Sequence, residues 1–143
     1  MKTRLDGFGL LLIVAICCLS SGCRKDYGVE LYSVSGTITL DGEPLKNASI
    51  QFRPDKTGKI VAPRGGIGYT DENGQYVMLF RDTRGCPAGK FHVVVSTYSE
   101  PYGDKKQGQK EVVPQRYRGT ESILSATVES ESNNEFNFEL TSN

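Results

Sequence analysis

The 143-residue sequence predicts an all-β protein, an antiparallel two-sheet β-sandwich of about seven strands that follows an N-terminal signal peptide. Three observations predict it: short segments of alternating apolar and polar residues, turn residues roughly every ten positions, and no helical period after Cys23. Alternation with a period of two places the apolar side chains on one face of a strand. An α/β enzyme scaffold does not fit this pattern.

The first segment, residues 1–22, is predicted to be a signal peptide. Lys2 and Arg4 precede an apolar run of 12 residues at positions 8–19, and small residues follow it. A transmembrane helix needs about 20 apolar residues to cross the hydrocarbon layer, so this run is too short to span it. It is typical of the central region of a cleaved signal.

The sequence Leu19-Ser-Ser-Gly-Cys23 resembles the lipobox of bacterial lipoproteins. In that motif the cysteine receives a diacylglycerol and becomes the new N-terminus after cleavage. Leu19 stands four positions before the cysteine instead of three, and Ser20 takes the usual place of leucine, so ordinary cleavage and secretion remain the alternative. We expect lipidation at Cys23 and a polar tether over residues 23–31.

Export to a membrane surface follows from this lipobox. Arg24, in place of an aspartate, resembles the pattern of lipoproteins sorted to the outer membrane. The expected location is therefore the periplasmic face of the outer membrane or the cell surface, with membrane lipid as the partner of the acylated Cys23. Cys86 is then the one unmodified thiol of the mature chain, and we expect a small buried residue there. If Cys23 were not acylated, a Cys23–Cys86 disulfide would become conceivable.

Composition limits the remaining function classes. Seventeen basic side chains balance 17 acidic ones, so the formal charge is zero and nucleic-acid binding through phosphates is excluded. Hydrophobic residues make up 37% of the chain, which is enough for one core of this size. Residues 32–143 are therefore predicted to form a single domain.

The first half of this domain predicts two strands and a tight hairpin. Residues 32–40 alternate, and Asp41-Gly42 follows as a hairpin signal. A second strand runs over residues 48–53, before a polar connection at 54–65. The side chains expected to face the core are Tyr32, Val34, Gly36, Ile38 and Leu40 on the first strand, and Ala48, Ile50 and Phe52 on the second.

The second half predicts the other strands. Asn73-Gly74 is a hairpin signal, and the apolar residues 76–80 indicate either a central strand or a twist that changes exposure. Residues 84–89 read as a loop, and residues 91–98 form the most β-prone stretch. Two closing strands are joined by a polar turn at 129–134. Inward positions are Phe91, Val93, Val95, Leu124, Ala126, Val128, Phe136, Phe138 and Leu140.

Four segments in this order resemble the carboxypeptidase regulatory-like domain: VSGTITLDGEPL at 34–45, ASIQF at 48–52, TDENGQY at 70–76 and PAGKFHVVV at 87–95. The segments VPQRY at 113–117, LSATV at 124–128 and NEFNFEL at 134–140 are similar to small bacterial lipoproteins built from one such domain. The resemblance implies a transthyretin-like (prealbumin-like) sandwich over residues 32–143. It also implies an accessory, non-catalytic module with no catalytic residues and no cofactor.

An enzymatic alternative comes from Tyr117-Arg118-Gly119-Thr120. It is similar to the Tyr-Arg-Gly-Ser ending of 5-hydroxyisourate hydrolases, which have a transthyretin-like fold and activate water with histidines. Here 23 residues follow Thr120 and the single histidine, His92, lies within a strand. A transthyretin-like hydrolase is therefore the disfavoured alternative, and the chain is expected not to be an enzyme.

Metal binding is not expected. His92 alone cannot form a zinc site, which needs three or four nitrogen or sulfur donors. Asp71, Glu72 and Asn73 offer oxygen ligands but lack the spaced carboxylates of a calcium loop, so a plain turn is favoured.

The long segment 99–122 is the candidate partner-binding loop, since loops of this length in small domains are often functional. It carries five basic and four acidic side chains, Glu111 among them. Candidate contact residues are Tyr98, Tyr102, Lys105, Lys106, Arg116, Tyr117 and Arg118. An envelope protein or a polysaccharide is the expected partner. Alternatively, Val112, Val113, Pro114 and Tyr117 pin this loop over an open end of the sandwich.

The sequence thus predicts a lipid-anchored, non-catalytic β-sandwich module of the cell envelope with a binding or structural role. An extracytoplasmic carbohydrate-binding module is the alternative, and it predicts exposed tyrosine rings in one plane.

Overall fold

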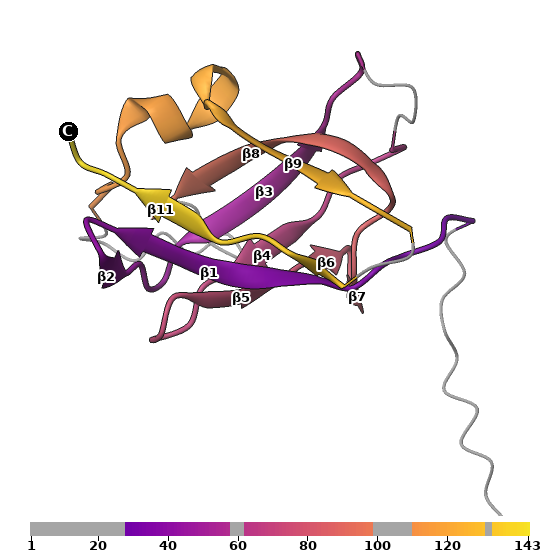
Figure 1. The fold of residues 1–143 in the computed structure, drawn as a ribbon, viewed down its shortest axis with the longest axis horizontal. Coiled ribbons are helices and arrows are strands. Elements are labelled where there is room, and N and C mark those ends of the chain that lie inside the picture. Colours follow the sequence, from indigo (N-terminus) through magenta and orange to yellow (C-terminus); the bar gives the residue numbers. More distant parts are fainter. Residues whose placement is uncertain (1–27, 58–61, 99–109, 131–132) are drawn as a thin grey trace, which may run out of the picture.

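Two β-sheets face each other in the computed structural model, which describes residues 28–57, 62–98, 110–130 and 133–143 (Figure 1). The described residues contain strands and two short 3-10 turns, so the predicted β-sandwich is confirmed. The predicted signal peptide, Cys23 and most of the tether lie outside the described residues. The strands are β1 Val34–Leu40, β2 Glu43–Pro44, β3 Ser49–Pro54, β4 Ile67–Tyr69, β5 Gln75–Val77, β6 Leu79–Phe80, β7 Thr83–Arg84, β8 Gly89–Ser96, β9 Leu124–Val128, β10 Asn134–Glu135 and β11 Phe138–Leu140, and the 3-10 turns are η1 Gln115–Tyr117 and η2 Gly119–Glu121.

One sheet is built around β1. It pairs antiparallel with β2 and β5 on one side and parallel with β10 and β11 on the other. The second sheet has the order β7-β6-β4-β3-β8-β9 and is antiparallel throughout. The described part of the chain thus has eleven strand segments instead of about seven. Several are only two or three residues long, because the chain changes sheets in the middle of an apolar run.

The hairpin predicted at Asp41-Gly42 is confirmed. Asp41 has φ 52° and Gly42 has φ 87°, and the flanking strands pair Leu40 with Glu43. Positive φ at both central positions is the geometry of the two-residue turns that follow the twist of a β-hairpin.

The hairpin predicted at Asn73-Gly74 is wrong in its pairing. The turn is present, with Gly74 at φ 72°, but it leads from β4 in one sheet to β5 in the other. The apolar run that follows is divided as well: β5 pairs with β1 and β6 pairs with β4. Met78, which is 0% exposed, lies between them, and its backbone N–H donates to the carbonyl of Val34. The apolar residues on both faces therefore mark a crossing between sheets.

The expectation of wholly antiparallel sheets is also wrong at the C-terminus. The chain leaves β9 in the second sheet and returns beside β1 in the first, where Val34 pairs with Asn134 and Ile38 with Phe138. Both β10 and β11 run parallel to β1.

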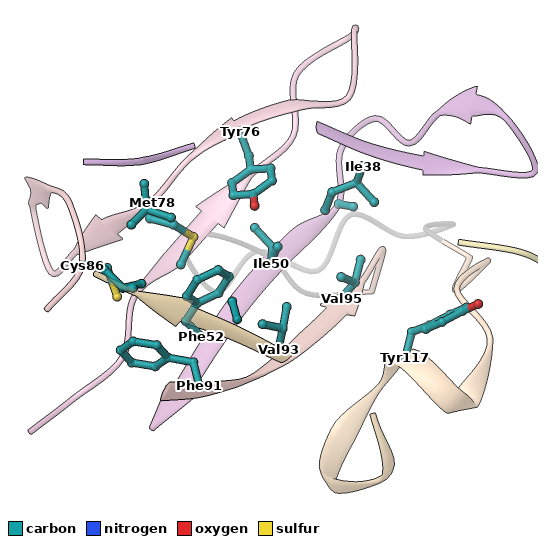
Figure 2. Close-up of a cluster of buried hydrophobic side chains, with 14 of the residues drawn as sticks. Ile38, Ile50, Phe52, Tyr76, Met78, Cys86, Phe91, Val93, Val95 and Tyr117 are labelled. Carbon is teal, nitrogen blue, oxygen red and sulfur yellow. The ribbon is translucent and has the colours of Figure 1, made fainter. Parts of the chain in front are cut away.

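The core lies between the sheets, and its side chains come from both (Figure 2). Ile38, Ile50, Phe52, Phe91 and Val95 are at most 2% exposed, as the alternation predicted. The rings of Phe52 and Phe91 are 5.6 Å apart between centroids. Segment 110–122 adds Val113 and Tyr117 to this core, so it forms part of the sandwich.

Candidate functional site

The described part of the predicted binding loop, residues 110–122, is fixed to the end of β8 through the carboxylate of Glu111. Oε2 accepts a hydrogen bond from Ser96 Oγ at 2.5 Å, and Oε1 accepts from Thr97 N at 3.1 Å, Thr97 Oγ1 at 2.9 Å and Val113 N at 2.9 Å. Burial raises the pKa of Glu111, but the hydrogen bonds from Ser96, Val113 and Thr97 outweigh burial and hold the pKa below its ordinary value. Glu111 is therefore an ionised anchor of this segment.

The next residues join the segment to the C-terminus. Arg116 donates from Nη2 to Thr141 Oγ1 at 2.8 Å and to the carbonyl oxygens of Thr141 and Asn143. The guanidinium carbon of Arg116 lies 4.8 Å from the centroid of the Tyr117 ring. The backbone N–H of Thr141 donates to the Tyr117 hydroxyl at 3.3 Å. Segment 110–122 thus bridges β8 of one sheet and the end of β11 of the other (Figure 1).

The seven candidate contact residues differ in their exposure, and three of them are not described by the structure. Tyr98 is 59% exposed, whereas the Tyr117 ring is 6% exposed and packs in the core (Figure 2). The expectation that Tyr117 offers aromatic surface is therefore wrong, because the residue belongs to the buried hydrophobic cluster. Arg118 Nε is buried and has no hydrogen-bond partner among the described residues. Tyr102, Lys105 and Lys106 lie outside the described residues.

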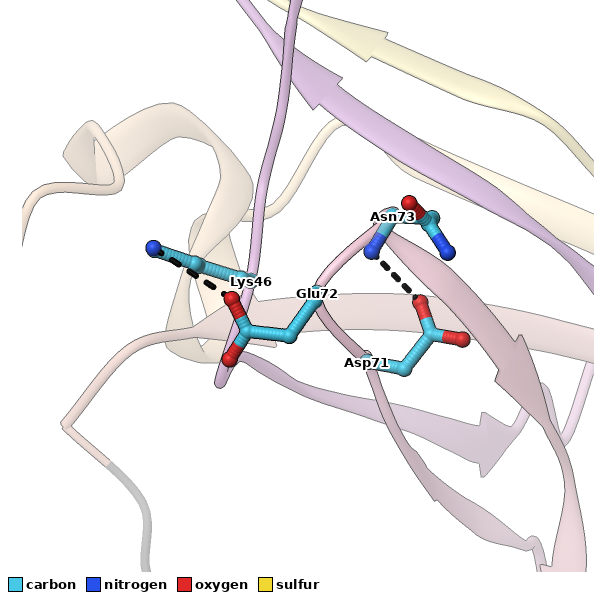
Figure 3. Close-up of polar contacts among 4 residues, drawn as sticks. All are labelled: Lys46, Asp71, Glu72 and Asn73. Carbon is cyan, nitrogen blue, oxygen red and sulfur yellow. Dashed lines mark hydrogen bonds and ion pairs between the residues drawn. The ribbon is translucent and has the colours of Figure 1, made fainter.

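In the acidic turn at residues 71–73, which offers oxygen ligands for calcium, the carboxylate of Asp71 binds backbone N–H groups. Asp71 Oδ1 accepts a hydrogen bond from the backbone N–H of Asn73 at 2.8 Å (Figure 3). It also accepts one from the backbone N–H of Gln75 at 2.9 Å. Glu72 pairs with Lys46 at 3.4 Å, with both side chains exposed. A side chain that bonds the backbone two residues on is the hydrogen bonding of an Asx turn. Across the described ranges, no three His, Cys, Asp or Glu side chains are grouped as metal ligands.

Cys86 is a buried free thiol, as predicted. It is 0% exposed, and burial raises its pKa to about 12, although a backbone hydrogen bond from Gly66 acts the other way. A thiol with so high a pKa holds almost no thiolate, which is the reactive form. The backbone of Cys86 pairs with Tyr32 through two 2.9 Å hydrogen bonds, so Cys86 holds the segment that precedes β1 against the domain.

A cleft of about 530 Å³ lies over the outer face of the six-stranded sheet. Strand register explains its floor, because Arg53 of β3 pairs with His92 of β8, and His92 pairs with Ser125 of β9. Directly opposed residues of neighbouring strands have Cβ atoms about 5 Å apart and point to the same face. The residues around the cleft are Arg53, Pro54, Asp55, Lys56, Lys90, Phe91, His92, Thr120, Ile123, Leu124 and Ser125.

The cleft carries more positive than negative charge. Among the described residues that line it, the one carboxylate belongs to Asp55, which lies 3.6 Å from Lys90 Nζ and accepts hydrogen bonds from Thr57 N at 2.8 Å and Oγ1 at 2.6 Å. The Thr57 hydrogen bonds hold the pKa of Asp55 below its ordinary value. His92 Nε2 is buried and has no hydrogen-bond partner among the described residues. An unpaired buried polar atom reduces the free energy of unfolding by about 1–3 kcal/mol. Such unpaired atoms in native proteins are often found at functional sites.

The sequence did not predict this cleft. The pattern put His92 within a strand, and the structure shows that this strand, β8, is flanked by β3 and β9 and that His92 is partly buried. The alternation over residues 51–53 and 90–92 places Gln51, Arg53, Lys90 and His92 on the faces opposite the core positions Phe52 and Phe91. Only the pairing register shows that those faces are adjacent.

Comparison with family models, with curated proteins and with solved structures finds no match for this chain. Within the described ranges, no helix is both long and apolar enough to cross a membrane.

Proposed function

We propose that this chain is a non-catalytic β-sandwich module of the carboxypeptidase regulatory-like type, held at the cell envelope by lipid on Cys23. The observation that supports the non-catalytic role is that Glu111, Asp71 and Cys86, three of its chemically capable side chains, are committed to structural contacts. Glu111 and Asp71 bond backbone N–H groups, and the Cys86 thiol is sealed in the core with a raised pKa. Each of these groups stabilises the fold, whereas a catalytic group would have to be accessible to a substrate.

The entry of the chain into the domain supports the tether. Near the start of the described residues, Tyr32 pairs with the sandwich through two backbone hydrogen bonds to Cys86. In the sequence, residues 23–31 then separate the lipid from Tyr32. Two acyl chains are enough for stable membrane attachment, so this segment would keep the domain close to the bilayer.

Fractionation of cells that express the full chain tests the anchor. The Cys23→Ala variant is expected to move from the membrane to the soluble fraction, while Cys18→Ala, which keeps Cys23, stays with the membrane. Mass spectrometry of the mature N-terminus should show an acylated cysteine. Membrane retention of Cys23→Ala, or an unmodified Cys23 thiol in the mature protein, would contradict the proposal.

The non-catalytic role has its own test. Purified protein is expected not to accelerate the hydrolysis of 5-hydroxyisourate above the rate in buffer. A rate that depends on protein concentration and is abolished by His92→Gln would establish the hydrolase alternative instead.

A further inference from the structure

We propose that the cleft over the outer face of the six-stranded sheet binds a hydroxylated organic anion of the size of an acidic monosaccharide. Its carboxylate would lie at Arg53 and His92, and its hydroxyl groups would face Thr120 and Ser125. This inference deepens the binding role proposed above, but it does not depend on lipidation of Cys23.

The preference for an anion comes from charge. Arg53, Lys56 and Lys90 provide three cations at the cleft against the single carboxylate of Asp55. Asp55 is already engaged by Lys90 and Thr57, so it does not neutralise Arg53. The exposed guanidinium of Arg53 bonds Gln51 Oε1 through Nη2 at 3.2 Å. A guanidinium has five N–H donors in a planar fork that matches the two oxygens of a carboxylate.

The position of the anion comes from the strand register. Arg53, His92 and Ser125 form one row across the adjacent strands β3, β8 and β9, of which β9 is an edge of the sheet. His92 Nε2 is buried and has no hydrogen-bond partner among the described residues. A ligand oxygen beside Arg53 would give the imidazole a hydrogen-bond partner that the described chain does not supply.

The size of the ligand comes from the volume of the cleft. At about 530 Å³ it is within the range of small-molecule sites, and each liquid water needs only about 30 Å³. A bare inorganic ion would leave most of this space unused. The lining also includes the hydroxyls of Thr120 and Ser125 and the aliphatic side chains of Ile123 and Leu124. This mixture suits a sugar, which has hydroxyl groups along its edge and C–H groups on its face.

The single histidine of the chain makes the site directly observable. His92 gives the only imidazole signals in an NMR spectrum of the full-length protein in detergent. Sodium glucuronate is expected to shift these signals saturably, whereas glucose at the same concentration and ionic strength shifts them little. Matched ionic strength is needed because salt screens exposed charges. Inorganic phosphate is the third probe, and it is expected to bind at least about 10-fold more weakly than glucuronate.

Arg53→Gln should weaken glucuronate binding by about 10-fold, the loss of one charge-assisted pair. Arg84→Gln is the matched control, because Arg84 is an exposed arginine at the opposite edge of the same sheet. Absence of a saturable shift with glucuronate, or an unchanged affinity in Arg53→Gln, would overturn the site. Equal affinity for phosphate and glucuronate would overturn its preference for a sugar.

The two proposals fail in different experiments. Glucuronate binding by a protein that is not lipidated would leave the site intact and overturn the anchor. Membrane-bound protein whose His92 signals do not respond would overturn the site and leave the anchor intact.

Discussion

The hydroxyl of Tyr76 donates a 2.7 Å hydrogen bond to the carbonyl oxygen of Phe136, across the break between β10 and β11. At this break the backbone N–H of Thr37 is bonded by the side chain of Asn137 at 2.9 Å instead of by a ladder carbonyl. Two side chains thus satisfy the backbone groups that the interrupted ladder would leave unpaired. Because both β5 and the C-terminal strands flank β1, this contact holds three strands together.

Removal of the Tyr76 hydroxyl should destabilise the fold. Tyr76 is 3% exposed, so Tyr76→Phe leaves the Phe136 carbonyl without its partner in a buried place. We expect a loss of about 1–3 kcal/mol in the free energy of unfolding, measured by urea denaturation. Tyr98→Phe removes the same group from a 59% exposed ring and should change stability by less than about 0.5 kcal/mol. Equal effects of the two substitutions would show that the hydrogen bond is not the stabilising element.

Gly36 should not tolerate a side chain. A Cβ at this position would lie 1.9 Å from the carbonyl oxygen of Phe136, which is backbone and cannot rotate away. Gly36→Ala is therefore expected to cost about 3 kcal/mol or more, or to prevent folding, as monitored by circular dichroism and denaturant titration. Ser35→Ala, at the neighbouring partly buried position of β1, is the control. An unaffected Gly36→Ala protein would show that the C-terminal strands do not approach β1 this closely.

The stability of the domain should fall in acid through Glu111. Its pKa is lower in the folded chain than in the unfolded chain, so its contribution is complete above the unfolded value of about 4.5. The contribution is lost as the pH falls through the lower folded pKa, because the protonated carboxyl accepts these hydrogen bonds less well. Glu111→Gln is expected to lower the free energy of unfolding at pH 7 by about 1–3 kcal/mol and to flatten its decline below pH 4.5.

Urea denaturation at a series of pH values measures this effect. Glu121→Gln, which changes a more exposed carboxylate of the same segment, serves as the control and should keep the acid decline. An identical decline in wild type and Glu111→Gln would assign the acid sensitivity to other carboxylates.

Cys86 should be inert in the folded protein. With 0% exposure and a pKa raised to about 12, its thiol is expected to resist iodoacetamide at pH 8 under native conditions and to react after unfolding in urea. Peptide mass spectrometry distinguishes Cys86 from the other three cysteines of the full chain. Rapid native alkylation would contradict its burial.

The local sequence pattern was sufficient to predict which face of each strand is buried and where one turn lies. Ile38, Ile50, Phe91 and Val128 were assigned to the core from alternation alone, and they are at most 2% exposed. Asp41-Gly42 likewise needs only its own backbone preferences to form the hairpin. The expectation of a small buried residue at Cys86 is also confirmed, because this residue is 0% exposed.

Pairing between distant segments could not be predicted in this way. The bond from Thr37 to Asn137 spans 100 residues, and nothing in either local pattern specifies the other. The same holds for the crossing at Met78, for the row of Arg53, His92 and Ser125, and for the use of Glu111 as an anchor. A period of two determines which face a side chain occupies, so the sequence by itself determined the layers and their contents. Which strands lie side by side depends on the total burial of the folded chain, so only the tertiary structure decided the sheet order, the parallel closing strands and the cleft.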